Sequence, residues 1–159
     1  MGFYINSLGT YNEGDRQGED TEVSQRPDWR YRWTGEAWEI PLNELKDAKW
    51  AEIKAERDYL EQAGVPYLGK VIDSDTVSIQ RIAIAVQAAQ AVVEAEQPFK
   101  LYWTMQDNTT LEMDAAQVVG MSVSLAQYSN SLHQIARALR EQIDAAKTAE
   151  ELKAIKWPE

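Results

Sequence analysis

Residues 99–158 decide the fold, and they read FKLYWTMQDNTTLEMDAAQVVGMSVSLAQYSNSLHQIARALREQIDAAKTAEELKAIKWP. The first part of this stretch predicts a β-hairpin, because apolar side chains recur at every second position on both sides of a polar turn at Asp107-Asn108. The alternating residues are Leu101, Trp103 and Met105 on the first strand and Leu111 and Met113 on the second. One face of the hairpin is therefore apolar and needs a cover.

A long helix is predicted directly after this hairpin. Asp114 is a suitable N-cap, and the helical pattern from Ala115 to about Ala146 corresponds to a length of roughly 45 Å. Apolar residues recur along it at intervals of three or four: Val118, Met121, Leu125, Tyr128, Leu132, Ile135, Leu139 and Ile143. This near-heptad spacing permits coiled-coil or bundle packing, including a homo-oligomer formed through the long C-terminal helix. Thr148 then caps a final turn, and Trp157-Pro158 follows as an anchor.

Upstream, residues 45–75 read LKDAKWAEIKAERDYLEQAGVPYLGKVIDSD and predict a charged helix followed by a short hairpin. Asn43 is the expected N-cap of the helix and Gly64 its stop, with two short strands within residues 65–72. Asp73 or Ser74 is expected to start the next helix, which is rich in alanine and extends over residues 76–96. Its expected core residues are Ile79, Ile82, Ala83, Val86, Ala89, Ala91 and Val93.

Residues 1–40 differ in character, since they hold three of the six tryptophans and lack a sustained helical period. They predict a small aromatic β module with strands at Phe3–Ile5, Arg30–Trp33 and Trp38–Ile40, the last two joined through Gly35. The polar, acidic stretch Asn12–Thr21 is expected to be an exposed loop.

The predicted fold class is therefore α+β. A small aromatic-rich β module at 1–40 is followed by a mainly helical domain with two β-hairpins and a long C-terminal helix at 42–159. Pro41 separates the two parts.

Composition limits the classes of function. The net charge of −10 and pI of about 4.6 argue against binding to nucleic acid, which needs clustered Lys and Arg. The absence of cysteine excludes disulfides and thiolate-bound metals. We expect no membrane span, because no run of 18 or more apolar residues occurs, and no secretory signal, because the N-terminus lacks a basic region followed by an apolar run.

Catalytic patterns are weak throughout the chain. His133 is the only histidine and lies on the long helix, where a packing or surface role is the ordinary one. No carboxylate spacing matches a metal site, no phosphate loop is present, and no nucleophile elbow occurs. We therefore expect no enzyme activity, no cofactor and no metal.

One aromatic and basic cluster in the β module is a candidate partner-binding site. Its residues are Tyr4, Trp29, Arg30, Tyr31, Arg32, Trp33 and Trp38. Trp, Tyr and Arg dominate binding hot spots, which favours a docking surface. The other interpretation makes the aromatics the core of a module too small to fold without them, with Trp29, Tyr31 and Trp33 on one face of a strand.

The order of these parts resembles a family of small tailed-bacteriophage proteins. The family is a domain of unknown function whose genes often lie beside tail-fibre genes, and its members are described as tail-fibre assembly proteins. The resemblance covers about two-thirds of the chain, from the helix containing Lys49-Trp50 to the closing Ile155-Lys156-Trp157-Pro158. The amino-terminal part adds Tyr4-Ile5-Asn6, Gly9-Thr10-Tyr11, Gly14-Asp15, Val23-Ser24-Gln25-Arg26-Pro27 and Trp33-Thr34-Gly35-Glu36-Ala37-Trp38, similar to the aromatic and glycine pattern that opens many such proteins.

The resemblance implies a chaperone that binds the distal part of a trimeric tail fibre or spike and helps it fold. It implies action in the host cytoplasm during assembly, with retention on the virion tail in some phages as a fibre cap or attachment protein. The alternative is a permanent structural component of the virion, such as a tail or baseplate adaptor that contacts other tail proteins.

Overall fold

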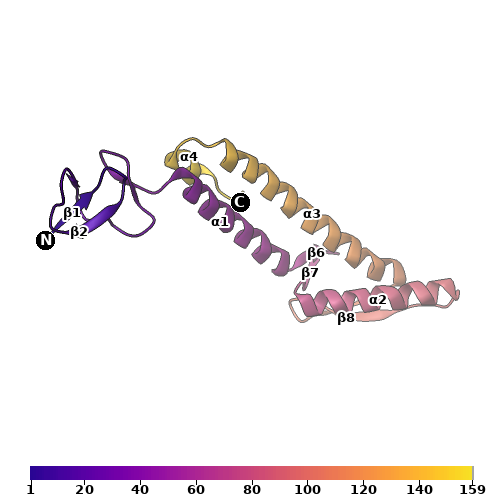
Figure 1. Ribbon diagram of the computed structural model, residues 1–159. Coiled ribbons are helices and arrows are strands. Elements are labelled where there is room, and N and C mark those ends of the chain that lie inside the picture. Colours follow the sequence, from indigo (N-terminus) through magenta and orange to yellow (C-terminus); the bar gives the residue numbers. More distant parts are fainter. Residues whose placement is uncertain (159) are drawn as a thin grey trace.

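The long C-terminal helix is the axis of the helical part of the protein. The computed structural model describes residues 1–158 and has the predicted α+β class. The helix α3 (Ala115–Ala145) contacts α1 along one half of its length and α2 along the other, which gives an elongated molecule with the β module at one end (Figure 1). The remaining elements are β1 (Gly2–Ile5), β2 (Tyr11–Gly14), β3 (Thr21–Glu22), β4 (Arg32–Trp33), β5 (Trp38–Glu39), α1 (Leu42–Gln62), β6 (Val65–Tyr67), β7 (Lys70–Ile72), α2 (Thr76–Glu94), β8 (Leu101–Thr104), β9 (Thr110–Met113) and α4 (Ala149–Ala154).

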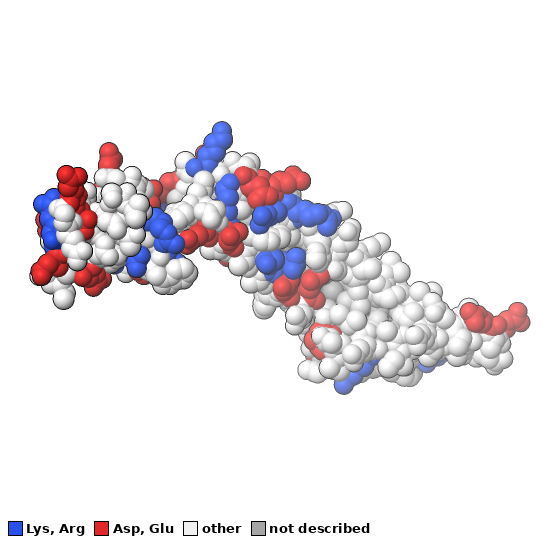
Figure 2. Space-filling model, viewed as in Figure 1, with Lys and Arg blue, Asp and Glu red and all other residues white. Residues whose placement is uncertain are grey.

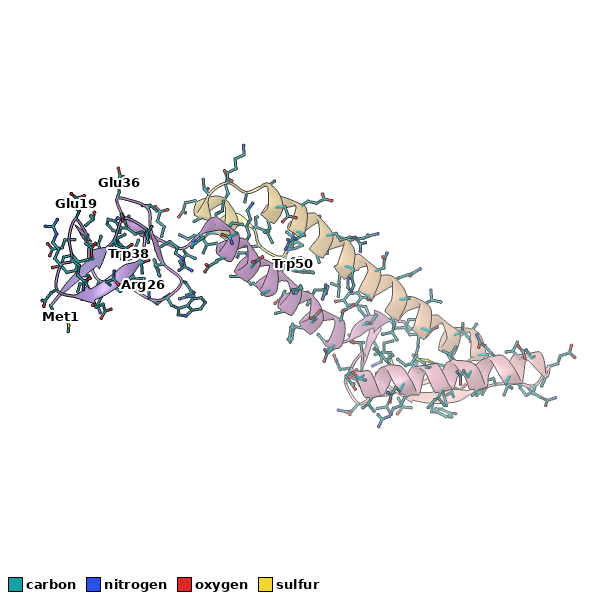
Figure 3. All side chains as sticks on the ribbon, in the orientation of Figure 1. Met1, Glu19, Arg26, Glu36, Trp38 and Trp50 are labelled. Atoms are coloured by element: carbon teal, nitrogen blue, oxygen red, sulfur yellow. The ribbon has the colours of Figure 1, made fainter. Side chains whose placement is uncertain are left out.

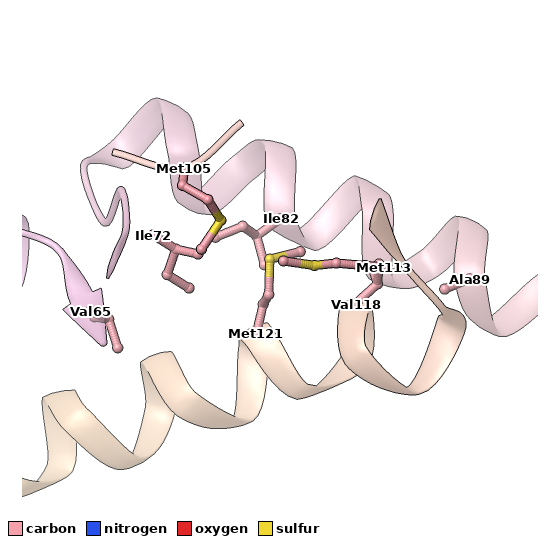
Figure 4. Close-up of a cluster of buried hydrophobic side chains, with 8 residues drawn as sticks. All are labelled: Val65, Ile72, Ile82, Ala89, Met105, Met113, Val118 and Met121. Carbon is pink, nitrogen blue, oxygen red and sulfur yellow. The ribbon is translucent and has the colours of Figure 1, made fainter. Parts of the chain in front are cut away.

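Two hydrophobic cores lie one after the other along α3. The distal core joins α2, both hairpins and the first half of α3 (Figure 4), and consists of Val65, Ile72, Ile82, Ala89, Met105, Met113, Val118 and Met121. The proximal core joins α1, α4 and the second half of α3, and consists of Ile53, Ala136, Leu139, Ile143, Ala146, Leu152 and Ile155. The predicted apolar stripe of α3 is thus covered by the chain's own helices, and self-association through this stripe stays a prediction.

The hairpin β8–β9 forms as its alternation predicts. Trp103 is the register partner of Leu111, and Leu101 is the partner of Met113. Asn108 adopts a φ of 61°, a conformation that the turn requires and that Asn tolerates. The apolar face of the hairpin lies on the distal core.

Two helix caps were predicted correctly and two were wrong. Asp114 forms a capping box with Gln117, and the hydroxyl of Thr148 accepts a hydrogen bond from the backbone of the final turn. For α1 the N-cap position is Pro41, not Asn43, and no side chain caps it. The cap of α2 is Asp75, whose carboxylate accepts from two backbone amides of the first turn.

Ser74, expected as one possible cap of α2, instead connects the first helix to the first hairpin. It is 1% exposed, its hydroxyl donates to the carbonyl of Glu61 at 2.6 Å, and it accepts from the amide of Gly64 at 2.9 Å. These bonds satisfy backbone groups that the end of α1 leaves unpaired.

Gly64 ends α1 in a conformation that other residues rarely adopt, with a φ of 110°. A Cβ at this position would lie 2.6 Å from Val71 Cγ1. We expect Gly64→Ala to lower the free energy of unfolding by about 1–3 kcal/mol, measured by urea denaturation. Gly69→Ala is the control, because its φ of 76° is also strained but nothing lies within 4 Å of its Cβ. A Gly64→Ala loss no larger than that of Gly69→Ala would contradict the crowding argument.

The predicted core of α2 was wrong in part. Ile82 and Ala89 are buried, but Ile79 and Val93 are 45% and 56% exposed, and Ala83 and Ala91 are exposed as well. The physical reason is that α3 and the hairpins cover one side of α2 only. The helix is also shorter than predicted, since it ends at Glu94.

In the β module the predicted strand Phe3–Ile5 forms as β1, but the rest of the module differs from the prediction in part. The stretch Asn12–Thr21 is not one loop: its start belongs to β2 and its end to β3, and both strands pair with the central strand β1. The predicted strand Arg30–Trp33 is reduced to Arg32–Trp33, because a turn at Asp28 occupies the preceding residues. The turn at Gly35 was predicted correctly, with a φ of 107°.

Candidate functional site

Four aromatic rings hold the β module together. Phe3 stacks on Tyr11 with ring centroids 6.2 Å apart, and Tyr11 makes an edge contact with Trp38 at 5.4 Å. Trp33 and Trp38 are register partners in the β4–β5 hairpin, and their rings are also 5.4 Å apart. Because these contacts join the two small sheets, Trp33 and Trp38 have a packing role.

Polar contacts fix the position of this aromatic cluster. The indole Nε1 of Trp38 donates to the carbonyl of Ser24 at 2.9 Å, and the Arg26 guanidinium lies 4.8 Å from the centroid of the Tyr11 ring. Figure 3 shows Arg26 and Trp38 within the module. The contacts attach Ser24 and Arg26, which follow β3, to the aromatic cluster, and the loop that carries Trp29 comes directly after them.

Trp29 is the exception among the tryptophans of the β module, since 71% of its surface is exposed. It lies between Asp28 and Arg30, which form a two-point ion pair: Arg30 Nε and Nη2 donate to the two carboxylate oxygens at 3.1 and 2.7 Å. The Arg30 amide also donates to Asp28 Oδ1 at 2.8 Å. Hydrogen bonds from Arg30 lower the pKa of Asp28 to about 2, so this ion pair is formed at neutral pH.

Arg32 fixes the other side of the Trp29 loop. Its Nη1 donates to the backbone carbonyls of Trp29 at 2.6 Å and Tyr31 at 3.2 Å. Its Nη2 lies 3.5 Å from the Glu44 carboxylate in the first turn of α1. One guanidinium thus connects the loop backbone to the helical part, and the exposed indole is presented from a backbone that is held on both sides.

A groove of about 770 Å³ lies at the base of this loop. Its walls come from the β module, from the first turn of α1 and from the segment before α4: Tyr31, Arg32, Thr34, Glu39, Ile40, Pro41, Leu42, Leu45, Lys147, Thr148 and Ala149. Figure 1 shows the link between the module and α1 beside α4. An exposed tryptophan next to a concave and partly apolar surface is a combination that protein-binding surfaces often have, so this region is the candidate site.

The structure separates the predicted site residues into two groups. Trp29, Arg30 and Arg32 are exposed; the first two lie on the loop before β4 and Arg32 begins β4. Tyr31 is half-buried, and Tyr31 and Arg32 line the groove. Tyr4, Trp33 and Trp38 are half-buried, and Tyr4 lies on the central strand with its ring over Gly2.

Sequence reasoning missed Asp28 and the helical wall of the groove. The spacing Asp-x-Arg after Pro27 is a recognisable signal, because Asp side chains accept bonds from amides two residues on. For Leu42, Leu45 and the residues before α4 no local signal exists, since only the tertiary fold brings them to the module.

The sole histidine lies in a polar cluster that connects α1 to α3. His133 Nε2 is 3.2 Å from the Glu61 carboxylate, and the Ser129 hydroxyl donates to the same oxygen at 2.5 Å. Both side chains contact the Glu61 carboxylate and not each other. In an activated nucleophile the hydroxyl would instead be hydrogen-bonded to the base. Within residues 1–158 no three His, Asp or Glu side chains are placed to hold a metal ion.

Residues 44–156 match the family described as Domain of unknown function (DUF4376). The chain belongs to this family. The DUF4376 match contains both hydrophobic cores. It also contains one wall of the groove, which Leu45 and the residues before α4 form. Trp29 and the β module precede it. Comparison with curated proteins and with solved structures gave no match.

Two tryptophans near the limits of the DUF4376 match meet in the proximal core. Trp50 lies near its start and Trp157 directly follows its last residue, and both pack against this cluster. Trp50, visible between α1 and α3 in Figure 3, also has the Arg140 guanidinium 5.2 Å from its ring centroid. These two tryptophans therefore contribute to the packing of the helical part, and the candidate contact surface lies elsewhere.

Proposed function

We propose that this protein is a bacteriophage tail-fibre assembly protein that binds the chains of a trimeric tail fibre or spike through the Trp29 loop and the adjacent groove. The observation that carries the proposal is the exposed indole on a loop fixed by Arg30 and Arg32. A preorganised aromatic anchor loses little conformational freedom on binding, so most of its burial energy contributes to affinity.

The physical need for such a partner lies in the fibre. Trimeric fibres bury long β surfaces with many contacts distant in sequence, so they fold slowly and expose unpaired edges meanwhile. An acidic protein of net charge −10 that covers such surfaces would also make the resulting complexes repel one another. The family resemblance of the amino-terminal pattern supports the same role.

The test is co-expression with a tail-fibre protein encoded in the same genome. We expect the two proteins to co-purify and the yield of fibre trimer to rise. Trp29→Ala is expected to weaken the complex by roughly 30-fold, since truncation of a hot-spot residue costs about 2 kcal/mol or more. The affinity can be measured by calorimetry with the purified fibre.

Tyr59→Ala is the matched control, because Tyr59 is also an exposed aromatic, at 67%, but lies on α1 and not on the groove. It should leave the affinity unchanged. If the wild-type proteins do not co-purify and the trimer yield stays the same, the proposed function is wrong. Equal losses for both variants would place the contact outside the Trp29 loop.

The second candidate is a permanent component of the tail or baseplate, and the elongated shape favours it (Figure 1). An elongated chain can join two neighbours, one at each end. Mass spectrometry of purified particles separates the two functions. A protein present at an integer ratio to the fibre is a virion component, and an absent protein that still forms the complex on co-expression is a released chaperone.

A further inference from the structure

We propose that two copies of this chain associate by packing their α2 helices against each other through the face that points away from α3. This contact surface is separate from the Trp29 loop and does not depend on the proposed function. We define the outer seam of α2 as Val77, Arg81, Ile84, Ala88 and Ala91, all of which are exposed.

The spacing of the outer seam is that of a helix-pairing surface. Its residues follow one another at intervals of four, three, four and three, the alternation of a heptad seam. Val77 and Ile84 are 53% and 67% exposed, and the alanines would let two helices approach closely. A second seam on the opposite side, which includes Ile82 and Ala89, is already covered by α3 and the hairpins. The helix thus has two pairing faces, and the single chain covers one.

The exposed area of the whole chain is large enough for such a contact. The chain exposes 10698 Å², whereas the size scaling of folded monomers gives roughly 8,100 Å² for 18.1 kDa. The excess is about 2,600 Å², and a standard interface buries roughly 800 Å² on each partner. Covering α2 would remove part of this excess.

The distribution of charge favours a second copy over a different partner. Two chains of net charge −10 repel each other, so they can meet only where like charges are sparse. Among the 19 residues of α2 only Arg81 and Glu94 are charged, and residues 115–136 of the neighbouring α3 contain no Asp, Glu, Lys or Arg. Figure 2 shows the surface over α2 almost free of charged atoms up to its acidic far end. Gln80 and Gln87 flank the seam, and amides are both donors and acceptors, so identical copies can pair them.

A lipid surface is the competing occupant. By length and composition α2 could cross a membrane, and 22% of that stretch is buried in the structure. Arg81 is one of the five residues of the exposed seam and lies beside Gln80, and burial of this cation in hydrocarbon is costly. In a helix pair the same side chain can extend to the solvent at the edge of the contact.

The experiment is sedimentation equilibrium of the full chain over a range of concentrations. We expect the wild-type mass to rise to twice 18.1 kDa and the Ile84→Glu variant to remain at 18.1 kDa. Glu is a good helix former, so the variant should keep its fold, which circular dichroism checks. Val123→Glu is the control, because Val123 is 49% exposed on α3, outside the seam, and this variant should still dimerise.

Three outcomes would overturn the proposal. The first is a wild-type chain that stays monomeric at every concentration. The second is an Ile84→Glu variant that still dimerises; if this variant does not fold, Ala91→Glu on the same seam decides the question. The third is a monomeric wild type that binds phosphatidylcholine vesicles and loses this binding with Ile84→Glu, which would assign the seam to a lipid surface.

Discussion

Replacement of Trp38 by alanine is expected to unfold the β module while the helical part stays folded. The Trp38 ring contacts both Tyr11 and Trp33, and its Nε1–H satisfies the carbonyl of Ser24. Removal of a packed Trp side chain costs about 3–5 kcal/mol. A module of this size has little stability to lose, and within residues 1–40 Val23, at 9% exposure, is the one buried hydrophobic residue.

Limited proteolysis is the measurement for this variant. Cleavage within residues 1–40 should become rapid, while the helical circular dichroism and the resistance of residues 44–156 stay unchanged. Trp29→Ala is the matched control, since it removes the same side chain from an exposed position and should change stability by less than about 0.5 kcal/mol. Equal protease sensitivity of the two variants would show that the aromatic contacts of Trp38 do not hold the module together.

Local signals in the sequence were sufficient for much of the helical part. The alternation around Asp107-Asn108 and the N-cap at Asp114 depend on residues within a few positions of each other, and both features formed as predicted. The helix predicted from Ala115 to about Ala146 matches α3 to within one residue at its end. In these elements the propensity, the cap and the apolar period all favour the same structure.

Features that depend on tertiary neighbours could not be predicted. The apolar residues of α2 are distributed around the whole helix, so the period does not say which of them contact α3, and Ile79 and Val93 were wrongly placed in the core. For α1, Asn43 is a good cap by residue type, but the chain already turns at Pro41.

The candidate site was predicted in part. The aromatic cluster of the module could be found by composition, but not its division into an exposed Trp29 and packed Trp33 and Trp38. That division goes with the turn at Asp28 and its ion pair with Arg30, which leave Trp29 outside the strand that begins at Arg32. The groove beside it needs Leu45 and the residues before α4, which are about a hundred positions apart in the sequence.

Ile82→Ala is expected to have the largest effect in the helical part, because Ile82 is 1% exposed in the middle of the distal core. Figure 4 shows its side chain beside those of Met113 and Met121. Truncation of a buried Ile to Ala leaves a cavity and lowers the free energy of unfolding by about 2–5 kcal/mol. Urea denaturation followed by circular dichroism measures the loss, which should appear as a lower midpoint with an unchanged slope.

Ile84→Ala is the matched comparison on the same helix, two residues away and 67% exposed. The change in helix propensity is identical, so the difference between the two variants isolates burial within one chain. In dilute protein Ile84→Ala should leave the free energy of unfolding unchanged or raise it slightly, since Ala is the better helix former.

If α2 pairs with a second copy, the free energy of unfolding of the wild type rises with protein concentration, and that of Ile84→Ala rises less. The reason is that association stabilises the folded state by mass action. A loss for Ile84→Ala as large as that for Ile82→Ala in dilute protein would contradict the assignment of the two faces.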